Sequence, residues 1–173
     1  MDGMNAGLLL LRLAVGLTMV AHGYNHVFRG GKIQGTAGWF ASLGMKPGIL
    51  HAWLASLVEL FAGSALALGF LTPLSAGALM GTMVVAGIIN HRKNGFFIFR
   101  PGEGWEYVMN LAVACLALGA IGPGEWSLDH AFDISFDRLS GWEGLVVAAV
   151  IGIGGGIGLL IVFWRPPVAK AGS

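Results

Sequence analysis

The sequence predicts an all-α integral membrane protein, a four-helix transmembrane bundle with a fifth transmembrane helix at the C-terminal end. Two observations predict this class. Only 11% of the 173 residues are charged, against about 25% in a typical soluble domain, so a water-soluble fold could not cover its surface. Hydrophobic residues make up 55% of the chain, and they fall in long blocks rather than in the short alternating runs of a soluble core.

The remaining composition narrows the class of protein further. The 29 glycines suit the close approach of helices in lipid. A formal net charge of +1 gives no indication of a nucleic-acid partner. The single cysteine, Cys115, excludes an internal disulfide and a thiolate metal cage. Composition therefore excludes a disordered chain, a disulfide-stapled secreted module and a cytosolic enzyme.

Five segments are long and apolar enough to cross a bilayer, which takes about 20 residues. They cover residues 7–27, 49–71, 73–89, 105–121 and 144–164. Only Leu71-Thr72-Pro73 separates the second segment from the third, so these two helices must be antiparallel neighbours. We expect two parts: a bundle over residues 1–140 that includes an acidic outer loop, and an additional helix with a short cytoplasmic tail over residues 141–173.

Loop charges predict the orientation, because Lys and Arg gather on the cytoplasmic side of a membrane. With five spans, one side carries Arg29, Lys32, Lys46, Arg92, Lys93, Arg100, Arg165 and Lys170. The opposite side carries only Arg138 together with Asp2, Glu125, Asp129, Asp133, Asp137 and Glu143. We therefore expect a multi-pass protein of the cytoplasmic (inner) membrane, with its N-terminus outside and its C-terminus in the cytoplasm.

Two loops have the composition of structured segments. In the first cytoplasmic loop, Thr36 and Gly44 bracket a short segment in which Trp39, Phe40 and Leu43 share one helical face. This pattern predicts a short interfacial helix on the cytoplasmic leaflet. The outer loop, residues 122–142, is acidic but too apolar for a solvated tether, so it either caps the bundle or faces a partner.

Two ionisable residues lie inside predicted spans, where each costs about 2.5–3.5 kcal/mol to insert. Arg12 lies one to two turns inside the outer end of the first span, and Glu59 lies near the middle of the second. Their depths differ by roughly 5–10 Å at 1.5 Å per residue, which a long Arg side chain can bridge. We expect a buried ion pair between Arg12 and Glu59. The alternative is that Arg12 extends outward to water and Glu59 is protonated.

A group of polar residues gathers in the cytoplasmic half of the predicted bundle. Its members are His22, His26, His51, Asn90, Glu106, Tyr107 and Asn110. Three interpretations remain open. In the first, the group is a satisfied polar network at the interface. In the second, it forms a pocket for a quinone or another small molecule, bound by His22, Glu59 and Tyr107 or Asn110. In the third, His22 and His51 hold a haem. No histidine spacing indicates a metal motif.

The fifth span carries glycines in a small-xxx-small pattern, which lets helix backbones approach closely. The pattern is met by Gly152 with Gly156 and by Gly154 with Gly158. This glycine face serves either internal packing or docking onto a helix of another protein.

Several ordered motifs resemble those of the DoxX family of small membrane proteins. They are LLLRLAVGLTMVAHG at residues 9–23, GTAGWFASLG at 35–44, LVEL at 57–60, NGFF at 94–97, GWEY at 104–107 and GPGEWSLD at 122–129. The resemblance covers roughly residues 8–140 and implies a four-helix membrane bundle. The family's motif positions fall on Arg12, His22, Glu59, Asn94, Glu106 and Tyr107. The fifth span departs from the four-helix unit, which is the arrangement we associate with an actinobacterial type.

The resemblance implies a link to membrane redox chemistry, because members are associated with quinone-linked sulfur oxidation, oxidoreductase assemblies and respiratory complexes. We expect a non-catalytic accessory subunit of a respiratory or other quinone-linked membrane complex, in contact with the lipid bilayer and with other membrane subunits. The alternative is a quinone-interacting oxidoreductase subunit that uses a cavity around His22 and Glu59. A small transporter is less favoured, because the spans lack matching broken helices in two halves. No cofactor motif is present, and a quinone or a lipid is the ligand such a cavity would take.

Overall fold

The computed structural model describes residues 2–134 and 139–167, and its regular structure is helical. The helices are α1 (Asp2–Phe28), α2 (Lys32–Ser42), α3 (Gly48–Leu68), α4 (Thr72–Ile89), α5 (Glu106–Ile121), α6 (Leu128–Ala131), α7 (Gly141–Ala149) and α8 (Gly155–Phe163). A 3₁₀ turn, His91–Lys93, follows α4, and a π-helical segment, Val150–Gly154, joins α7 to α8. Asp137, Arg138 and Lys170, which contributed to the predicted orientation, lie outside the described residues.

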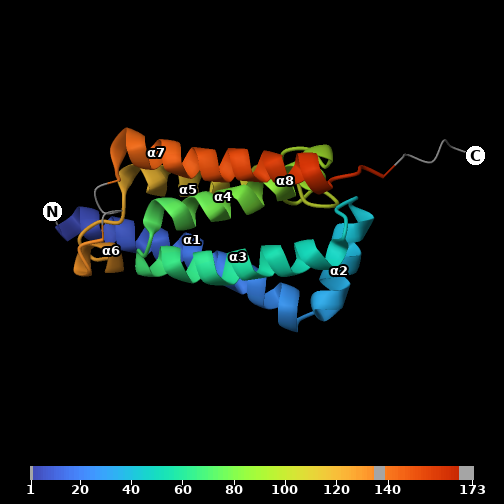
Figure 1. Ribbon diagram of the computed structural model, residues 1–173, viewed down its shortest axis with the longest axis horizontal. Helices are drawn as coiled ribbons and strands as arrows, with labels where there is room; N and C mark the ends of the chain where they lie inside the picture. The colour runs from blue at the N-terminus through green and yellow to red at the C-terminus, as the bar shows by residue number, and fades with distance from the viewer. Residues whose placement is uncertain (1, 135–138, 168–173) are drawn as a thin grey trace, which may run out of the picture.

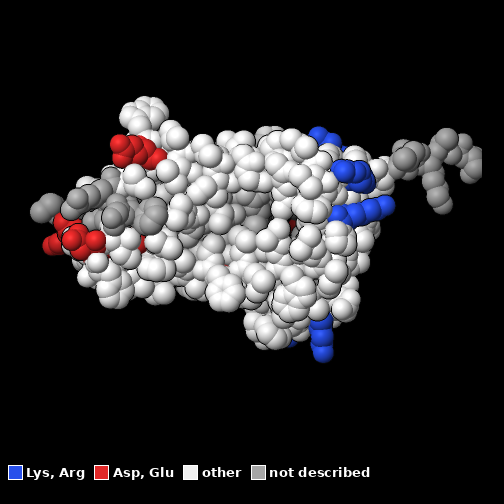
Figure 2. Space-filling model, viewed as in Figure 1, with Lys and Arg blue, Asp and Glu red and all other residues white. Residues whose placement is uncertain are grey.

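The predicted all-α membrane fold is confirmed. Helices α1, α3, α4 and the continuous run Gly141–Phe163 are long and apolar enough to cross a membrane, and α5 is a shorter apolar helix. The two termini lie at opposite ends of the elongated molecule (Figure 1). On the face shown in Figure 2, Lys and Arg gather at one end and most of the Asp and Glu at the other. We call these the basic end, which carries α2, and the acidic end, which carries α6; the side of the membrane that each faces stays a prediction.

The long helices form two layers (Figure 1). In one layer α1 packs antiparallel against α3 through glycines. Gly16 lies against the backbone at Gly63, and Gly23 lies against Ser56 and Glu59. A Cβ at Gly63 would lie 2.8 Å from the Gly16 carbonyl oxygen, so a larger residue there would push the two helices apart.

The second layer contains α4, α5 and the C-terminal span α7–α8 (Figure 1). Gly77 of α4 lies against Ile151, and Gly152 lies against Met80. Gly119 of α5 approaches the backbone at Gly144 of α7. The C-terminal span is therefore packed into the bundle through small residues, and the division at residue 140 stays a prediction.

The interfacial helix of the first loop is present but begins earlier than predicted. It runs over Lys32–Ser42 rather than from Thr36. The Thr36 hydroxyl does not cap a helix; it donates to the carbonyl oxygens of His26 (2.9 Å) and Lys32 (3.3 Å), so Thr36 sits inside the helix. The chain leaves the helix at Gly44, whose φ of +92° suits a residue without a side chain.

The end of α8 is tied to this first loop. The Trp164 indole donates to the Leu43 carbonyl oxygen at 2.9 Å. Backbone bonds join Lys46 N to Phe163 O (3.2 Å) and Arg165 N to Gly44 O (2.8 Å). The fifth span is thus anchored to the basic end of the first layer as well as packed against the second.

Candidate functional site

The acidic end is closed by a polar network around Arg12. The Arg12 side chain is fully buried, and its Nη2 donates to the Trp126 carbonyl oxygen. Its guanidinium lies against Gly69, the left-handed residue that ends α3 with a φ of +65°, where any side chain would collide with it. Asn5 and Glu125 exchange two hydrogen bonds, of 2.7 and 3.0 Å. These bonds fix the start of the outer loop on the bundle.

Asp129 completes this network by capping α4. Its buried carboxylate accepts hydrogen bonds from Leu71 N (2.7 Å), Thr72 N (2.9 Å) and the Thr72 hydroxyl (2.9 Å). The negative charge of Asp129 also acts on the Arg12 guanidinium. A carboxylate at a helix N-terminus is favourable because it pairs with free amide groups and with the positive end of the helix dipole. The outer loop was predicted either to cap the bundle or to face a partner, and its described part covers the acidic end of the bundle.

The expected ion pair between Arg12 and Glu59 does not form, although the structure describes both residues. The reason is the register of the antiparallel helices. Arg12 faces the C-terminal end of α3 at Gly69, whereas Glu59 faces Gly23. Arg12 and Gly23 are eleven residues apart, which is about 16 Å along a helix axis, farther than an Arg side chain can bridge. Glu59 instead lies 3.4 Å from His26, measured between Oε2 and Nε2.

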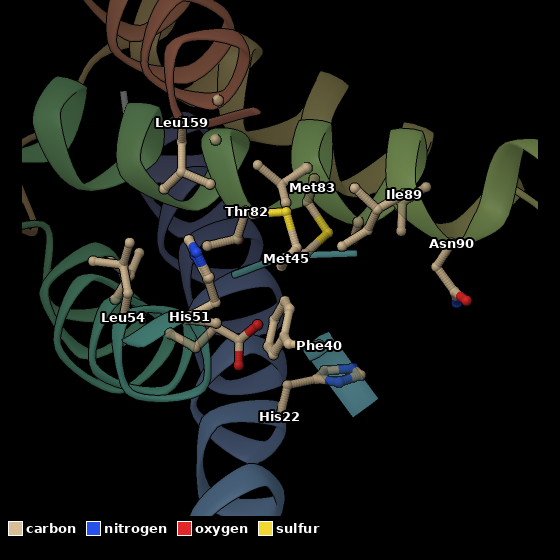
Figure 3. A pocket seen from close by; sticks show the side chains of 18 of the residues that line it. His22, Phe40, Met45, His51, Leu54, Thr82, Met83, Ile89, Asn90 and Leu159 are labelled. Carbon is tan, nitrogen blue, oxygen red and sulfur yellow. The ribbon is translucent and has the colours of Figure 1, made fainter. Parts of the chain in front are cut away.

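A cavity of about 650 Å³ lies between the two layers, towards the basic end. Figure 3 shows His51 and Leu54 of α3 on one side of it, and Thr82 and Met83 of α4 on another. Its volume falls in the range of small-molecule sites, about 300–1,000 Å³, and such sites combine an apolar wall with a few polar groups. The polar or ionisable side chains that line it are His22, His26, His51, Glu59, Thr82, Asn90, His91, Glu103 and Tyr107.

Two of these polar side chains are buried and each have one atom that lacks a hydrogen-bond partner. Glu59 is 5% exposed and His51 is 2% exposed. The 3.4 Å approach of His26 to Glu59 does not have the direction of a hydrogen bond, so Glu59 Oε2 remains unsatisfied, as does His51 Nε2. The His51 ring packs edge-on against Phe163 at 5.1 Å between centroids, which holds its orientation. An unsatisfied buried polar group costs about 1–3 kcal/mol, so both groups favour a polar atom in the cavity.

The remaining polar groups are held by local bonds. The His22 Nε2 atom lies 3.3 Å from the Tyr107 hydroxyl and links α1 to α5. His91 Nδ1 lies 2.9 Å from the Glu103 carbonyl oxygen; because a carbonyl can only accept, His91 donates from that nitrogen. The Asn94 amide donates to the carbonyl oxygens of Gly102 and Glu103. These bonds fix the loop that brings Glu103 to the cavity.

The structure brings five of the seven residues in the predicted polar group to the cavity. His22, His26, His51, Asn90 and Tyr107 line it. Glu106 and Asn110 do not: the Glu106 carboxylate accepts from Ile98 N (3.1 Å), and the Asn110 amide donates to the Glu106 carbonyl oxygen (3.0 Å). Residues i and i+4 share a helix face, so the turn of α5 that points Tyr107 inward points these two elsewhere.

Sequence reasoning missed Glu103 as a cavity residue. It lies in the loop before α5, where helical periodicity gives no information on direction. The signal that could have found it is its neighbourhood: Asn94 and Gly102, which hold the loop, both precede it in the sequence. Among the described residues, no group of three His, Cys, Asp or Glu side chains is arranged to hold a metal ion.

The glycines of the C-terminal span divide between three environments. Gly152 and Gly156 pack inside the bundle against Met80 and Val84 of α4. Gly154 and Gly158 are exposed and have open space at the Cβ position. Gly155, between them, lines the cavity, as does Gly156. The four glycines predicted to form one docking face therefore do not share a single role.

Of the comparisons with known proteins, one gives a match, and it covers the first half of the chain. No curated protein and no solved structure matches the chain. The family model described as DoxX matches residues 7–92, which carry α1 to α4, including Arg12, Glu59 and most of the cavity wall. The chain belongs to the DoxX family of membrane proteins.

Proposed function

We propose that this protein binds a quinone-type molecule in the cavity at its basic end and serves a quinone-linked membrane redox complex. The observation that carries the proposal is that two buried, unsatisfied polar atoms, Glu59 Oε2 and His51 Nε2, line one cavity whose other walls are mostly apolar. A ligand with polar atoms on a ring could form hydrogen bonds with these two atoms, and its apolar chain could fill the apolar part of the cavity.

The chemistry of the polar groups suits both redox states of a quinone. A neutral imidazole has one donor and one acceptor nitrogen, and a carboxyl group can accept or, when protonated, donate. His51 and Glu59 can therefore pair with the carbonyl oxygens of a quinone or with the hydroxyl groups of a quinol. Tyr107 and His22 add a hydroxyl and a ring nitrogen on the α1–α5 side of the same cavity.

The experiment measures quinone binding by thermal stabilisation of the purified full-length chain in mild detergent, with a short-chain benzoquinone or naphthoquinone as probe. A ligand present at 100 times its Kd stabilises the folded state by about 2.7 kcal/mol. At roughly 2–4 °C per kcal/mol for a chain of this size, the melting temperature should rise by about 5–11 °C.

Matched variants test where the probe binds. His51→Phe keeps the aromatic packing against Phe163 and removes the ring nitrogens, and Glu59→Gln keeps the volume and removes the carboxyl. Each should weaken binding by about 1–3 kcal/mol, or roughly 5- to 150-fold. Glu106→Gln, outside the cavity, is the control and should bind like the wild type. The proposal would be refuted if all three variants bound the quinone with equal Kd values. It would also be refuted if the wild type showed no saturable quinone binding, or if a phospholipid occupied the cavity.

A second candidate function is that of an accessory subunit that docks onto a helix of another membrane protein. The observation that favours it is the exposed pair Gly154 and Gly158, whose Cβ positions meet open space. Leucine at both positions should abolish copurification with a stoichiometric redox partner while the protein stays folded, because a small-residue contact in lipid depends on close approach. Unchanged copurification would contradict this role.

A further inference from the structure

We infer that the cavity opens sideways into the bilayer between α3 and α8, and that a membrane-dissolved ligand with a long apolar chain enters and leaves by this opening. The inference rests on the proposed function, because it names the path and the chain of the ligand whose head group lies near Glu59 and His51. Leu54 and Val58 of α3 line the cavity from one layer, and Gly155 and Leu159 of α8 line it from the other.

The opening is bounded at both ends along the helices. Towards the basic end, the first loop is bonded to the end of α8 through Lys46 and Phe163 and through Gly44 and Arg165. Towards the acidic end, the tight turn at Leu71 joins α3 directly to α4. The gap between α3 and α8 is therefore closed at the level of the loops and open at the level of the apolar spans. The face seen in Figure 2 is hollowed between these two layers.

The side chains at this opening leave it clear. Gly155 has no side chain, and a Cβ placed on it would meet nothing within 4 Å. Leu54, on the opposite side, is 40% exposed; Figure 3 shows Leu54 and Leu159 on facing walls with the cavity between them. The π-helical segment Val150–Gly154 ends directly before Gly155. Gly152 and Gly156 pack against α4, and Gly156 also lines the cavity together with Gly155 and Leu159, which lie four residues apart on one face.

Elsewhere the accessible part of the cavity carries polar groups. His22 and Glu103 line it and are exposed, together with the exposed apolar side chains Trp39 and Ile98. An apolar chain leaving on that side would pass charged and polar groups, whereas the α3–α8 side offers leucine, isoleucine and glycine. The two sides fit an amphipathic ligand whose head lies against the polar groups and whose isoprenoid or alkyl chain extends between Leu54 and Gly155 into the lipid.

The experiment compares Gly155→Leu with Gly154→Leu. The two substitutions are identical, lie one residue apart and both meet open space, but only Gly155 faces the cavity. Each variant, reconstituted in phospholipid nanodiscs, is titrated with a long-chain isoprenoid quinone and with the same head group carrying a methyl group in place of the chain. Gly155→Leu should weaken binding of the long-chain quinone at least tenfold and change binding of the chainless analogue less than twofold. Gly154→Leu should change neither.

The outcomes separate the opening from the binding site. Equal losses for both ligands in Gly155→Leu would mean that the leucine fills the head-group site, and this would overturn the side opening. Unchanged binding of both ligands would overturn it as well, while the proposed quinone site would stand. If the wild-type protein binds neither ligand, the proposed function fails and the inference fails with it. A photoreactive group at the end of the quinone chain gives a second readout: it should label the peptides that contain Leu54 and Gly155, and labelling confined to the loop that carries Glu103 would overturn the side opening.

Discussion

Replacing Arg12 should destabilise the protein through its contacts at the acidic end and not through Glu59. Arg12 is completely buried, donates to the Trp126 carbonyl oxygen and is influenced by the charge of Asp129. Arg12→Met keeps much of the side-chain volume and removes the charge and the donor. It leaves the Trp126 carbonyl without its partner and the Asp129 carboxylate without a nearby positive charge.

The expected magnitude follows from these two losses. Removing one partner of a buried ion pair costs about 3–5 kcal/mol, which is an upper bound here because the Asp129 carboxylate keeps its three hydrogen bonds at the start of α4. Two of the Arg12 nitrogens, Nε and Nη1, have no hydrogen-bond partner in the folded state, so part of that cost is already present in the wild type. We therefore expect Arg12→Met to lower the free energy of unfolding by about 3 kcal/mol, the low end of this range. This corresponds to a loss of about 6–12 °C in melting temperature.

Double-mutant cycles identify the residue to which Arg12 is energetically coupled. Arg12→Met combined with Asp129→Asn should show a coupling of about 1–2 kcal/mol, within the range for residues that share a network. Arg12→Met combined with Glu59→Gln should be additive within about 0.5 kcal/mol, because the two residues lie about 16 Å apart along the helices. The assay is unfolding of the purified protein in mixed detergent micelles, followed by circular dichroism. Coupling of more than about 1 kcal/mol to Glu59, with additivity to Asp129, would refute this reasoning.

Three further predictions test the topology and the packing. A reporter active only in the cytoplasm should work when fused after residue 173, and a periplasmic reporter should work within residues 125–137; the reverse pattern would contradict the predicted orientation. Gly63→Leu should lower the yield of folded protein in the membrane, because α1 and α3 touch there, whereas Gly158→Leu should not. Trp164→Phe should cost about 1 kcal/mol of unfolding free energy through the lost hydrogen bond to the first loop, and an unchanged melting temperature would show that this bond is not stabilising.

The secondary structure could be predicted from sequence because hydropathy over 20 residues is a strong signal in a membrane protein. The starts and ends of α3, α4 and α5 fall within a few residues of the expected ones. The first loop was harder, because Thr36 suits both a cap and an interior position that bonds back to the preceding turn. Only the tertiary contact with His26 decides between them.

The partners of buried charges could not be predicted in the same way. The sequence shows that Arg12 and Glu59 need partners, but their depth depends on the register of α1 against α3. That register is fixed by the contacts of Gly16 and Gly23, which no single-residue property reveals. The expected depth difference of roughly 5–10 Å was too small by about four to seven residues, and this moved the expected partner of Arg12 from the loop at the acidic end to the middle of α3. Periodicity on α5 similarly could not show which of Glu106 and Tyr107 points inward.

The two ends of the bundle differ in what surrounds their buried polar groups, and this difference separates structure from function. At the acidic end, the carboxylate of Asp129 uses three hydrogen bonds and the Asn5–Glu125 pair uses two. Such a network fixes one arrangement of loop and helices. At the basic end, Glu59 and His51 are buried within the same cavity without hydrogen bonds to their inward-facing atoms. Each end leaves two buried polar atoms without a partner, Arg12 Nε and Nη1 at the acidic end and Glu59 Oε2 and His51 Nε2 at the basic end, but only the second pair lines the cavity. Unsatisfied polar atoms beside open volume have the arrangement of a binding site, because a ligand can supply the missing partner.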